Sequence, residues 1–303
     1  MRRRLPPMEQ IEAFLEAARG PSFRAAAERC ALSPAAFTRR IQAFSSHVGV
    51  PLFVRDGTRL RLSRTGLECL KELEPAYLAL RRAAADVASR DPAGARVTVS
   101  LSHSLAVGWL IPRLEEFSAA HPGISVELVT RRDASALRRG DADIGICFSD
   151  VDLSGFACER LFGIVAAPVA APSVVARCSR SAHPLSGLSL LSVTWPPDIW
   201  NQWSERTGRN DALATPARFE MLQAMYESAA CGQGIAIGAS PTVWPYLHSG
   251  RLVRLPLPAA RLRGGYRIAS THSRKRPRSI DTVWRWLRSE AQKTPDLSPV
   301  AAA

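Results

Sequence analysis

Hydrophobic residues in the first fifty positions recur every three or four residues, which predicts short amphipathic helices. In the clearest stretch, Phe37, Ile41 and Phe44 share one helical face, and this apolar stripe must pack against a core. A shorter helix precedes it from Ser22, so residues 22–44 predict two helices joined by a tight connection. This pattern is typical of a helix-turn-helix, although a helical hairpin without a binding role would show it too.

The second of these helices has a strong start signal and an outer face suited to DNA. Ser33 is a favoured N-cap, and Pro34 stands at the first helical position, where its missing N–H costs nothing. Small and polar groups together with a cation suit a helix that enters the major groove. The candidate base readers on this outer face are Ser33, Pro34, Ala35, Thr38, Arg39 and Gln42.

A short β-hairpin is predicted next. Asp56 and Gly57 supply the turn, and arginine alternates with leucine beyond it. We expect the leucines to pack inward and the arginines to point out. On such a wing, Arg55, Arg59 and Arg61 would neutralise DNA phosphates, while an ordinary solvated basic face is the alternative.

From Gly66 the hydrophobic period becomes about 3.5 residues, which is typical of a coiled coil. Pro75 interrupts the pattern and predicts a kink or a division of the helix, and residues 91–94 read as a hinge. We predict a linker helix that dimerises; the alternative is an amphipathic helix that lies on its own domain. The seam consists of Leu70, Leu73, Tyr77, Leu80, Ala84 and Val87.

From residue 95 onward, predicted strands alternate with predicted helices, which favours a parallel α/β sheet with right-handed crossovers. Two such halves joined by crossing strands leave a cleft, and open α/β sheets bind ligands at the carboxyl ends of their strands. The predicted strands lie near residues 97–101, 124–128, 143–148, 161–165, 235–238, 251–255 and 266–270. The predicted helices lie near residues 105–119, 134–139, 221–231 and 280–290.

The charge distribution favours a polyanionic partner for the N-terminal part. The net charge is +13, and residues 1–90 carry 16 basic against 9 acidic side chains. A basic surface that merely keeps the protein in solution is the alternative. Only three of the cations are lysines, which also indicates a coding bias, so not every arginine needs a function.

The six cysteines are scattered without a C-x-x-C spacing, so we expect buried small hydrophobes, with a redox sensor as the alternative. No metal or cofactor is predicted. The first residues lack the apolar run of a secretory signal, and no 18-residue apolar stretch could span a membrane. We therefore expect a cytoplasmic protein.

The ordered motifs resemble those of LysR-type transcriptional regulators over about residues 5–290. The N-terminal matches are Ser22-Phe23, Ala26-Ala27-Glu28, Ser33, Ala36, Thr38-Arg39, Ile41, Ala43, residues 48–53, Arg55, Leu62-Ser63 and Gly66. The C-terminal matches are residues 109–114, Phe117, His121-Pro122, residues 143–146 and residues 232–237. The Trp-Leu-x-Pro-Arg-Leu run at 109–114 is similar to the subgroup that holds the glycine-cleavage activator and β-lactamase-gene regulators.

This resemblance implies an α/β multidomain protein with an N-terminal winged helix-turn-helix and a long linker helix. The C-terminal two-subdomain α/β effector domain would resemble a type II periplasmic binding protein. It also implies a homodimer or homotetramer that binds double-stranded promoter DNA and a small-molecule effector and, as an activator, RNA polymerase. The predicted parts are 1–65 for DNA binding, 66–94 for the dimerising linker and hinge, and 95–303 for the effector domain. Subdomain I would take about 95–164 and 266–303, and subdomain II about 165–265.

Carried over by position, the resemblance assigns the outer face of the second helix to bases and the wing arginines to phosphate. Two departures change this picture. The family often has Gln where Pro34 stands and an acidic residue where Ser45 stands. Because Gln reads adenine through two hydrogen bonds and Pro reads none, we expect an altered DNA preference.

For the effector, Ser102 and Ser104 follow the first predicted strand, where helix N–H groups and hydroxyls suit a carboxylate. Met221 stands where some relatives carry a hydroxyl, which makes that wall of the cleft less polar. The alternative for each position is an ordinary loop or core residue. The implied effector-binding residues are Ser102, Ser104, Thr130, Thr194, Met221 and Tyr266.

Two other classes of function compete with a regulator. An α/β enzyme lacks support, because the chain shows no glycine-rich phosphate loop, no metal-ligand spacing and no nucleophile constellation. His103 is the one eye-catching residue, and a loop histidine without a catalytic role explains it better. A solute-binding protein with a helical N-terminal extension is opposed by the basic N-terminus and the missing signal.

Overall fold

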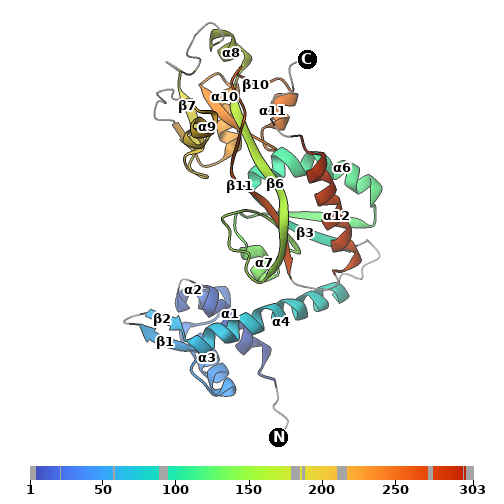
Figure 1. The fold of residues 1–303 in the computed structure, drawn as a ribbon. Coiled ribbons are helices and arrows are strands. Elements are labelled where there is room, and N and C mark those ends of the chain that lie inside the picture. Colours follow the sequence, from blue (N-terminus) through green and yellow to red (C-terminus); the bar gives the residue numbers. More distant parts are fainter. Residues whose placement is uncertain are drawn as a thin grey trace. The chain divides into compact units, whose positions relative to one another are not determined.

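The chain divides into two compact units, Met1–Val87 and Ala88–Ala303 (Figure 1). The computed structural model describes residues 5–20, 22–56, 59–88, 95–178, 185, 188–209, 217–271, 276–295 and 297. In this part of the chain, no helix combines the length and the hydrophobicity needed to cross a bilayer.

Three helices form the core of the N-terminal unit: α1 (Met8–Arg19), α2 (Phe23–Arg29) and α3 (Pro34–Val48). Aromatic rings hold them together, since Phe37 meets Phe23 edge to face with centroids 5.8 Å apart. Small residues set the distance between α2 and α3. The side chains of Ala26 and Ala27 on α2 are fully buried, so α3 packs closely against α2.

The wing consists of β1 (Phe53–Asp56) and β2 (Arg59–Leu62), which pair antiparallel. At its base, Phe53 and Leu62 face each other and pack against the helical core. The predicted turn residue Gly57 lies outside the described residues. Among the described side chains of the wing, those that pack against the helical core lie at its base.

The register corrects the expected orientation of the wing side chains. Arg55 pairs with Leu60, and Val54 pairs with Arg61. Paired residues share a face of the hairpin, so Arg55 lies on the face of Leu60 and opposite to Arg61. Leu60 is 45% exposed. The expectation of inward leucines and outward arginines is wrong for this pair, because the hairpin extends beyond the core.

A single helix, α4 (Arg64–Ala88), continues through Pro75, so the prediction that Pro75 divides it is wrong. A proline removes one backbone donor from the helix ladder, which weakens the helix locally. Packing on both sides of the proline compensates. Leu73 lies against the core before it, and Tyr77 after it donates a hydrogen bond of 2.7 Å to Glu12 of α1.

The two halves of the predicted seam of α4 differ in burial. Its first half, Leu70, Leu73 and Tyr77, packs onto the core of the N-terminal unit, as the alternative reading expected. In its second half, Leu80 and Ala84 are exposed. The side chain of Val87 and the predicted hinge at 91–94 lie outside the described residues.

The strands of the C-terminal unit form one mixed sheet in the order β4-β3-β5-β11-β6-β9-β7-β8, with β10 beside β6. Two groups are parallel, β4-β3-β5 and β9-β7-β8, whereas β6 and β11 run antiparallel to their neighbours. The strands are β3 (Ala95–Leu101), β4 (Ile124–Thr130), β5 (Ile144–Phe148), β6 (Phe156–Ala170), β7 (Leu190–Val193), β8 (Ala217–Phe219), β9 (Ile235–Ala239), β10 (Val253–Arg254) and β11 (Ala260–Thr271). The predicted parallel sheet is confirmed within these two groups and is wrong for β6 and β11, which run antiparallel to their neighbours.

The two long central strands, β6 and β11, pass through both halves of the unit (Figure 1). The predicted strands at 161–165 and 266–270 are only parts of them. We call the half built on β3, β4 and β5 lobe I, and the half built on β7, β8, β9 and β10 lobe II. The predicted subdomain limits, 164/165 and 265/266, fall inside β6 and β11.

Helices cover both lobes. Lobe I carries α5 (His103–Leu105), the π-helical turn η1 (Ala106–Leu110), α6 (Ile111–Ala120), α7 (Ser135–Arg139) and α12 (Arg278–Lys293). Lobe II carries α8 (Pro172–Cys178), α9 (Ile199–Thr207), α10 (Leu222–Ala230) and α11 (Trp244–His248). The sequence patterns missed α8, α9, α11, β7 and β8. The predicted helix at 105–119 contains η1, and Pro112, two residues after η1, lacks the N–H that a regular α-helix would direct at the Gly108 carbonyl within it.

The cysteines only partly follow the expectation of burial. Cys147 is buried, and this burial raises the pKa of its thiol to about 11. Cys158 and Cys231 are exposed, so the expectation is wrong for them. Cys158 lies on the long strand β6 and Cys231 at the end of α10, where the neighbouring elements do not cover the side chains.

Candidate functional site

The helix α3 presents a polar face opposite its buried stripe. The Ser33 hydroxyl accepts a hydrogen bond of 3.3 Å from the backbone N–H of Ala36, which confirms its role as N-cap. The Thr38 hydroxyl donates to the Pro34 carbonyl at 2.9 Å, so its lone pairs remain free to accept. All six candidate base readers are exposed, while Phe37 beneath them is fully buried.

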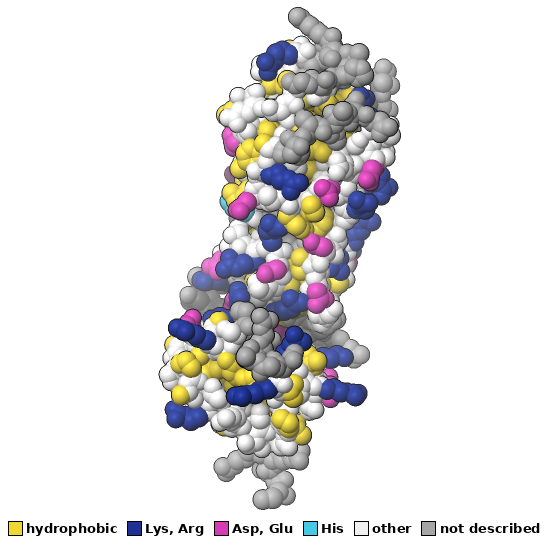
Figure 2. Space-filling model, turned by 90° about the vertical axis from the view of Figure 1, so that its left-hand side faces the viewer, with side chains coloured by type: hydrophobic (Ala, Val, Ile, Leu, Met, Phe, Trp, Pro, Cys, Tyr) yellow, Lys and Arg dark blue, Asp and Glu magenta, His cyan; other side chains and the backbone are white. Residues whose placement is uncertain are grey.

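Exposed arginines occur on α3 and on the wing. Arg39 is exposed and makes no ion pair with any described residue. Arg55 and Arg61 of the wing are also exposed, and the side chain of Arg59 is outside the described part. Figure 2 shows basic side chains spaced over one face of the N-terminal unit, between hydrophobic and uncharged surface. Such spacing suits contacts with successive phosphates.

In the C-terminal unit, a cleft opens at the carboxyl ends of the parallel strands of both lobes. Its outer part, which we call the mouth, has a volume of about 510 Å³. Thr130 ends β4, Thr194 follows β7, and Met221 precedes α10, where it is 46% exposed. The mouth is lined by Ser102, His103, Ser104, Thr130, Arg131, Arg132, Thr194, Glu220 and Met221. It therefore brings together five of the six predicted effector residues.

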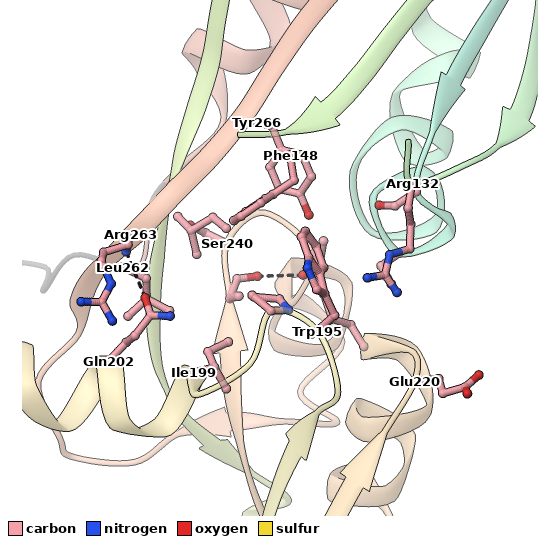
Figure 3. A pocket seen from close by; sticks show the side chains of 17 residues that line it. Arg132, Phe148, Trp195, Ile199, Gln202, Glu220, Ser240, Leu262, Arg263 and Tyr266 are labelled. Atoms are coloured by element: carbon pink, nitrogen blue, oxygen red, sulfur yellow. Dashed lines mark hydrogen bonds between the residues drawn. The ribbon is translucent and has the colours of Figure 1, made fainter. Parts of the chain in front are cut away.

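The sixth, Tyr266, lines a deeper space that we call the inner chamber (Figure 3). Ser102 and Ser104 line both spaces, so the chamber continues the mouth. Burial raises the pKa of the Tyr266 hydroxyl to about 12, and a hydrogen bond with Ser102 and the charge of Arg132 oppose this rise. Tyr266 thus remains a neutral hydrogen-bond donor at neutral pH.

Aromatic side chains from both lobes form the inner chamber. The Phe148 ring, at the end of β5, meets the Trp195 ring edge to face with centroids 4.8 Å apart. Phe148 also contacts Tyr266 at 5.6 Å. The guanidinium carbon of Arg132 lies 4.5 Å from the centroid of the Trp195 ring, which is cation–π distance. Figure 3 shows Trp195 standing between Phe148 and Arg132.

Sequence reasoning missed Arg132, Phe148 and Trp195. Arg132 lies two residues after the predicted site residue Thr130, and Trp195 lies one residue after Thr194. Aromatic and cationic residues just beyond strand ends are a weak signal on their own, because their partners come from distant parts of the chain. The contact between the lobes is visible only in three dimensions.

A hydrogen bond also crosses the cleft directly. The side-chain amide of Gln223, in the first turn of α10, donates to the Ser104 carbonyl at 3.0 Å. The other end of this amide, Oε1, is buried without a partner among the described residues. Lobe II therefore holds the wall of the cleft that carries Ser104.

Two family models together match most of the chain. Residues 8–67 match the bacterial regulatory helix-turn-helix protein of the lysR family, and residues 90–292 match the LysR substrate binding domain. The first covers the helices and the wing of the N-terminal unit. The second covers both lobes.

Characterised relatives cover nearly the same length. The glycine cleavage system transcriptional activator of Escherichia coli strain K12 is 29% identical over 256 residues, 84% of this chain and 83% of the relative. The transcriptional regulator TrpI of Pseudomonas aeruginosa is 29% identical over 262 residues, 83% of this chain and 87% of the relative. The transcriptional activator AmpR of Rhodobacter capsulatus is 27% identical, covering 94% of this chain and 97% of the relative.

Solved structures support the fold. The effector domain of AmpR from Pseudomonas aeruginosa aligns with a TM-score of 0.56 and 26% identity, over 66% of this chain and 96% of that domain. ArgP from Mycobacterium tuberculosis aligns with a TM-score of 0.65 and 18% identity, over 96% of this chain and 99% of the other. The second likeness concerns the fold alone.

Proposed function

We propose residue roles for a chain that belongs to the LysR family of transcriptional regulators, as its two matched regions and its relatives establish. It is a DNA-binding regulator controlled by a small-molecule effector, and it is not an enzyme. The predicted resemblance and the predicted combination of a helix-turn-helix with a two-lobed α/β domain are confirmed. The finer assignments below are our proposals.

In our proposal, α3 reads DNA bases through its exposed face. The observation that carries this is the opposition between the buried side chain of Phe37 and the exposed side chains of Thr38, Arg39 and Gln42. Arg39 suits a guanine and Gln42 an adenine, through two hydrogen bonds each. Ser33, Pro34 and Ala35 give a close approach at the start of the helix. Arg55, Arg59 and Arg61 contact phosphate from both faces of the wing.

Replacing Arg39 by alanine should weaken specific DNA binding by about 1–3 kcal/mol, because a pair of hydrogen bonds to guanine is lost. Fluorescence anisotropy would compare a duplex from the upstream region of the chain's own gene with a random duplex of equal length. The affinity of the variant for the random duplex should fall only slightly. The midpoint temperature of thermal unfolding should be unchanged, since Arg39 is exposed. Equal losses on both duplexes would make Arg39 a phosphate contact.

The regulator as a whole is tested by a mobility shift with the same upstream duplex. We expect a shift at low salt that weakens steeply as salt rises, because phosphate contacts release counterions. A shift that an unrelated competitor duplex abolishes equally well would count against sequence-specific binding.

In our proposal, the effector binds in the cleft between the lobes. The predicted residues there, Ser102, Ser104, Thr130, Thr194, Met221 and Tyr266, come from both lobes and from β11. Polar groups at the mouth would orient the ligand, and the apolar chamber would hold its body. A ligand that touches both lobes can shift their relative position and so change the state of the regulator.

We further propose that α4 dimerises through its second half. Leu80 is 51% exposed, and Ala84 one turn later is exposed as well, which leaves an apolar strip open to a partner. Two such dimers would form the proposed homotetramer, which works in the cytoplasm and, as an activator, contacts RNA polymerase. In this scheme α4 is the predicted linker of residues 66–94, although the helix begins at Arg64, two residues before the predicted division.

Replacing Leu80 by aspartate should convert the protein to lower oligomers, because a charge would enter the helix–helix interface. Light scattering coupled to size exclusion would measure the mass. The matched control is Leu67→Asp, which changes an equally exposed leucine (57%) on another face of the same helix. Leu73 is unsuitable because it packs in the core of its own unit. Equal masses for both variants would contradict the proposed seam.

A further inference from the structure

The contact between Arg132 and Trp195 lies at the passage between the mouth and the inner chamber. Arg132 follows β4 of lobe I, and Trp195 follows β7 of lobe II, so their contact joins the two lobes. Arg132 lines both spaces, and the Trp195 ring lines the inner one. Arg132 is therefore within reach of a ligand in either space.

Arg132 is a cation without an anionic partner. It is exposed and makes no ion pair within the part of the chain that the structure describes. The Arg131 side chain, which also lines the mouth, donates to the neutral Thr130 carbonyl at 2.8 Å. At the inner end, a guanidinium nitrogen of Arg263 lies 3.9 Å from a carboxylate oxygen of Glu205, and both side chains are largely exposed. Arg132 therefore places a positive charge close to the hydroxyls of Ser102 and Tyr266.

The inner chamber itself is apolar. Besides Phe148, Trp195 and Tyr266, the side chains of Ile164, Ile199, Leu222 and Leu262 line it. Its hydroxyl groups are partly engaged, since the Ser240 hydroxyl accepts a hydrogen bond from the backbone N–H of Val165 at 3.2 Å. The acidic Glu220 is exposed, and Figure 3 shows its carboxylate directed away from the Trp195 ring. A cationic ligand would therefore find no buried counter-charge there.

The present size of the chamber excludes a ring. Its volume is about 60 Å³. A cavity that holds benzene needs about 150 Å³. The Trp195 ring occupies the adjoining space between Phe148 and Arg132, with an edge-to-face contact on one side and a cation on the other. A flat ring of the ligand could make both contacts if Trp195 moved aside.

We propose that the effector is a small carboxylate with a flat, aromatic body, which takes the place of the Trp195 ring. The carboxylate pairs with Arg132 and accepts hydrogen bonds from Ser102 and Tyr266. The aromatic body packs against Phe148 and the aliphatic wall of the chamber. Since Trp195 belongs to lobe II and its two partners to lobe I, this exchange breaks one contact between the lobes and couples binding to their movement. The inference rests on the proposed effector role of the cleft.

The ligand class is tested with three probes: benzoate has the ring and the charge, benzyl alcohol has only the ring, and acetate has only the charge. Isothermal titration calorimetry on the full chain should show benzoate binding at least about ten-fold more tightly than either other probe. Arg132→Gln should remove most of this preference over benzyl alcohol. The control is Arg206→Gln, which removes the same charge from the exposed surface of α9. This variant should keep the preference for benzoate over benzyl alcohol. No binding of benzoate below about 10 mM would overturn the proposal.

The exchange of rings is tested with Trp195. Trp195→Ala should bind benzoate several-fold more tightly than the unchanged chain, because no ring has to leave. Equal or weaker binding would overturn the exchange. Benzoate should also change the tryptophan emission, and Trp195→Phe should abolish this change. Trp286→Phe is the control and should retain it, since Trp286 packs against Phe117 in lobe I.

The same preparations should be used in the mobility shift with the upstream duplex. If DNA binds specifically and benzoate does not bind, only the inferred ligand class fails. If specific DNA binding is absent, the proposed function fails whatever benzoate does. The two failures are thus distinguishable.

Discussion

Replacing Trp109 by alanine is expected to lower the free energy of unfolding of the C-terminal unit by about 3–5 kcal/mol. Trp109 is fully buried in η1, and its ring meets Phe162 of β6 at 5.1 Å. The indole N–H donates to the Thr294 hydroxyl at 2.7 Å. Removal of this side chain leaves a cavity and takes one donor from the Thr294 hydroxyl, which still donates to the Glu290 carbonyl at 2.7 Å, so the cavity accounts for most of the loss.

The large expected effect also follows from what Trp109 anchors. Thr294 comes directly after α12 of lobe I, and the chain then runs to lobe II. There, the indole N–H of Trp244 donates to the Pro295 carbonyl at 2.9 Å, and Leu297 is 1% exposed within the core around β9. Trp109 therefore fixes a segment that connects the two lobes.

Chemical denaturation followed by circular dichroism would measure the loss. Trp109→Phe keeps a ring but lacks the donor, so its loss should be smaller. Trp286→Ala removes a partly buried indole from the same lobe and should also cost less. A loss below about 1 kcal/mol for Trp109→Ala would mean that the surroundings close the cavity or that the anchor is unimportant.

Replacing Phe37 by alanine is expected to destabilise the N-terminal unit by about 3–5 kcal/mol, a large part of the 5–15 kcal/mol typical of a whole domain. Phe37 is fully buried beneath the exposed polar face of α3 and contacts the Phe23 ring. Without it, α3 loses its fixed position on α2. Specific DNA binding should disappear, although no DNA-facing side chain is changed.

The mobility shift and the benzoate titration would together separate this effect from global unfolding. Phe37→Ala should abolish the shift and leave ligand binding by the C-terminal unit intact, because the two units have separate cores. Arg39→Ala is the matched comparison, since it should weaken reading without loss of stability. A normal DNA shift by Phe37→Ala would show that the core of this unit tolerates the cavity.

Local patterns predicted the N-terminal unit well. The N-cap Ser33, the first-turn Pro34 and the stripe Phe37, Ile41 and Phe44 act within α3 itself, so the sequence contains the whole signal. The prediction for the wing was wrong in one respect. From the alternation of arginine and leucine we expected the leucine side chains to point inward and the arginine side chains outward, yet Leu60 is 45% exposed.

The outline of the C-terminal unit was predicted correctly, but the direction of the strands β6 and β11 was not. Alternating strands and helices indicated an α/β fold with a cleft, but nothing in β6 or β11 shows that these strands run antiparallel to their neighbours. Strand direction depends on which segments meet across the sheet. Similarly, Pro75 is a local helix breaker, and contacts of α4 with α1 on both sides of it preserve the helix.

By itself, the sequence determined helix α3, the alternation of strands and helices, the family and five residues of the cleft mouth, because each depends on spacing along the chain. The tertiary structure alone decided the inner chamber. Arg132, Phe148 and Trp195 belong to separate loops and strands, and they meet because β6 and β11 bring the ends of the parallel strands together. Contacts of this kind have no period in the sequence, since they arise only when distant segments pack against each other.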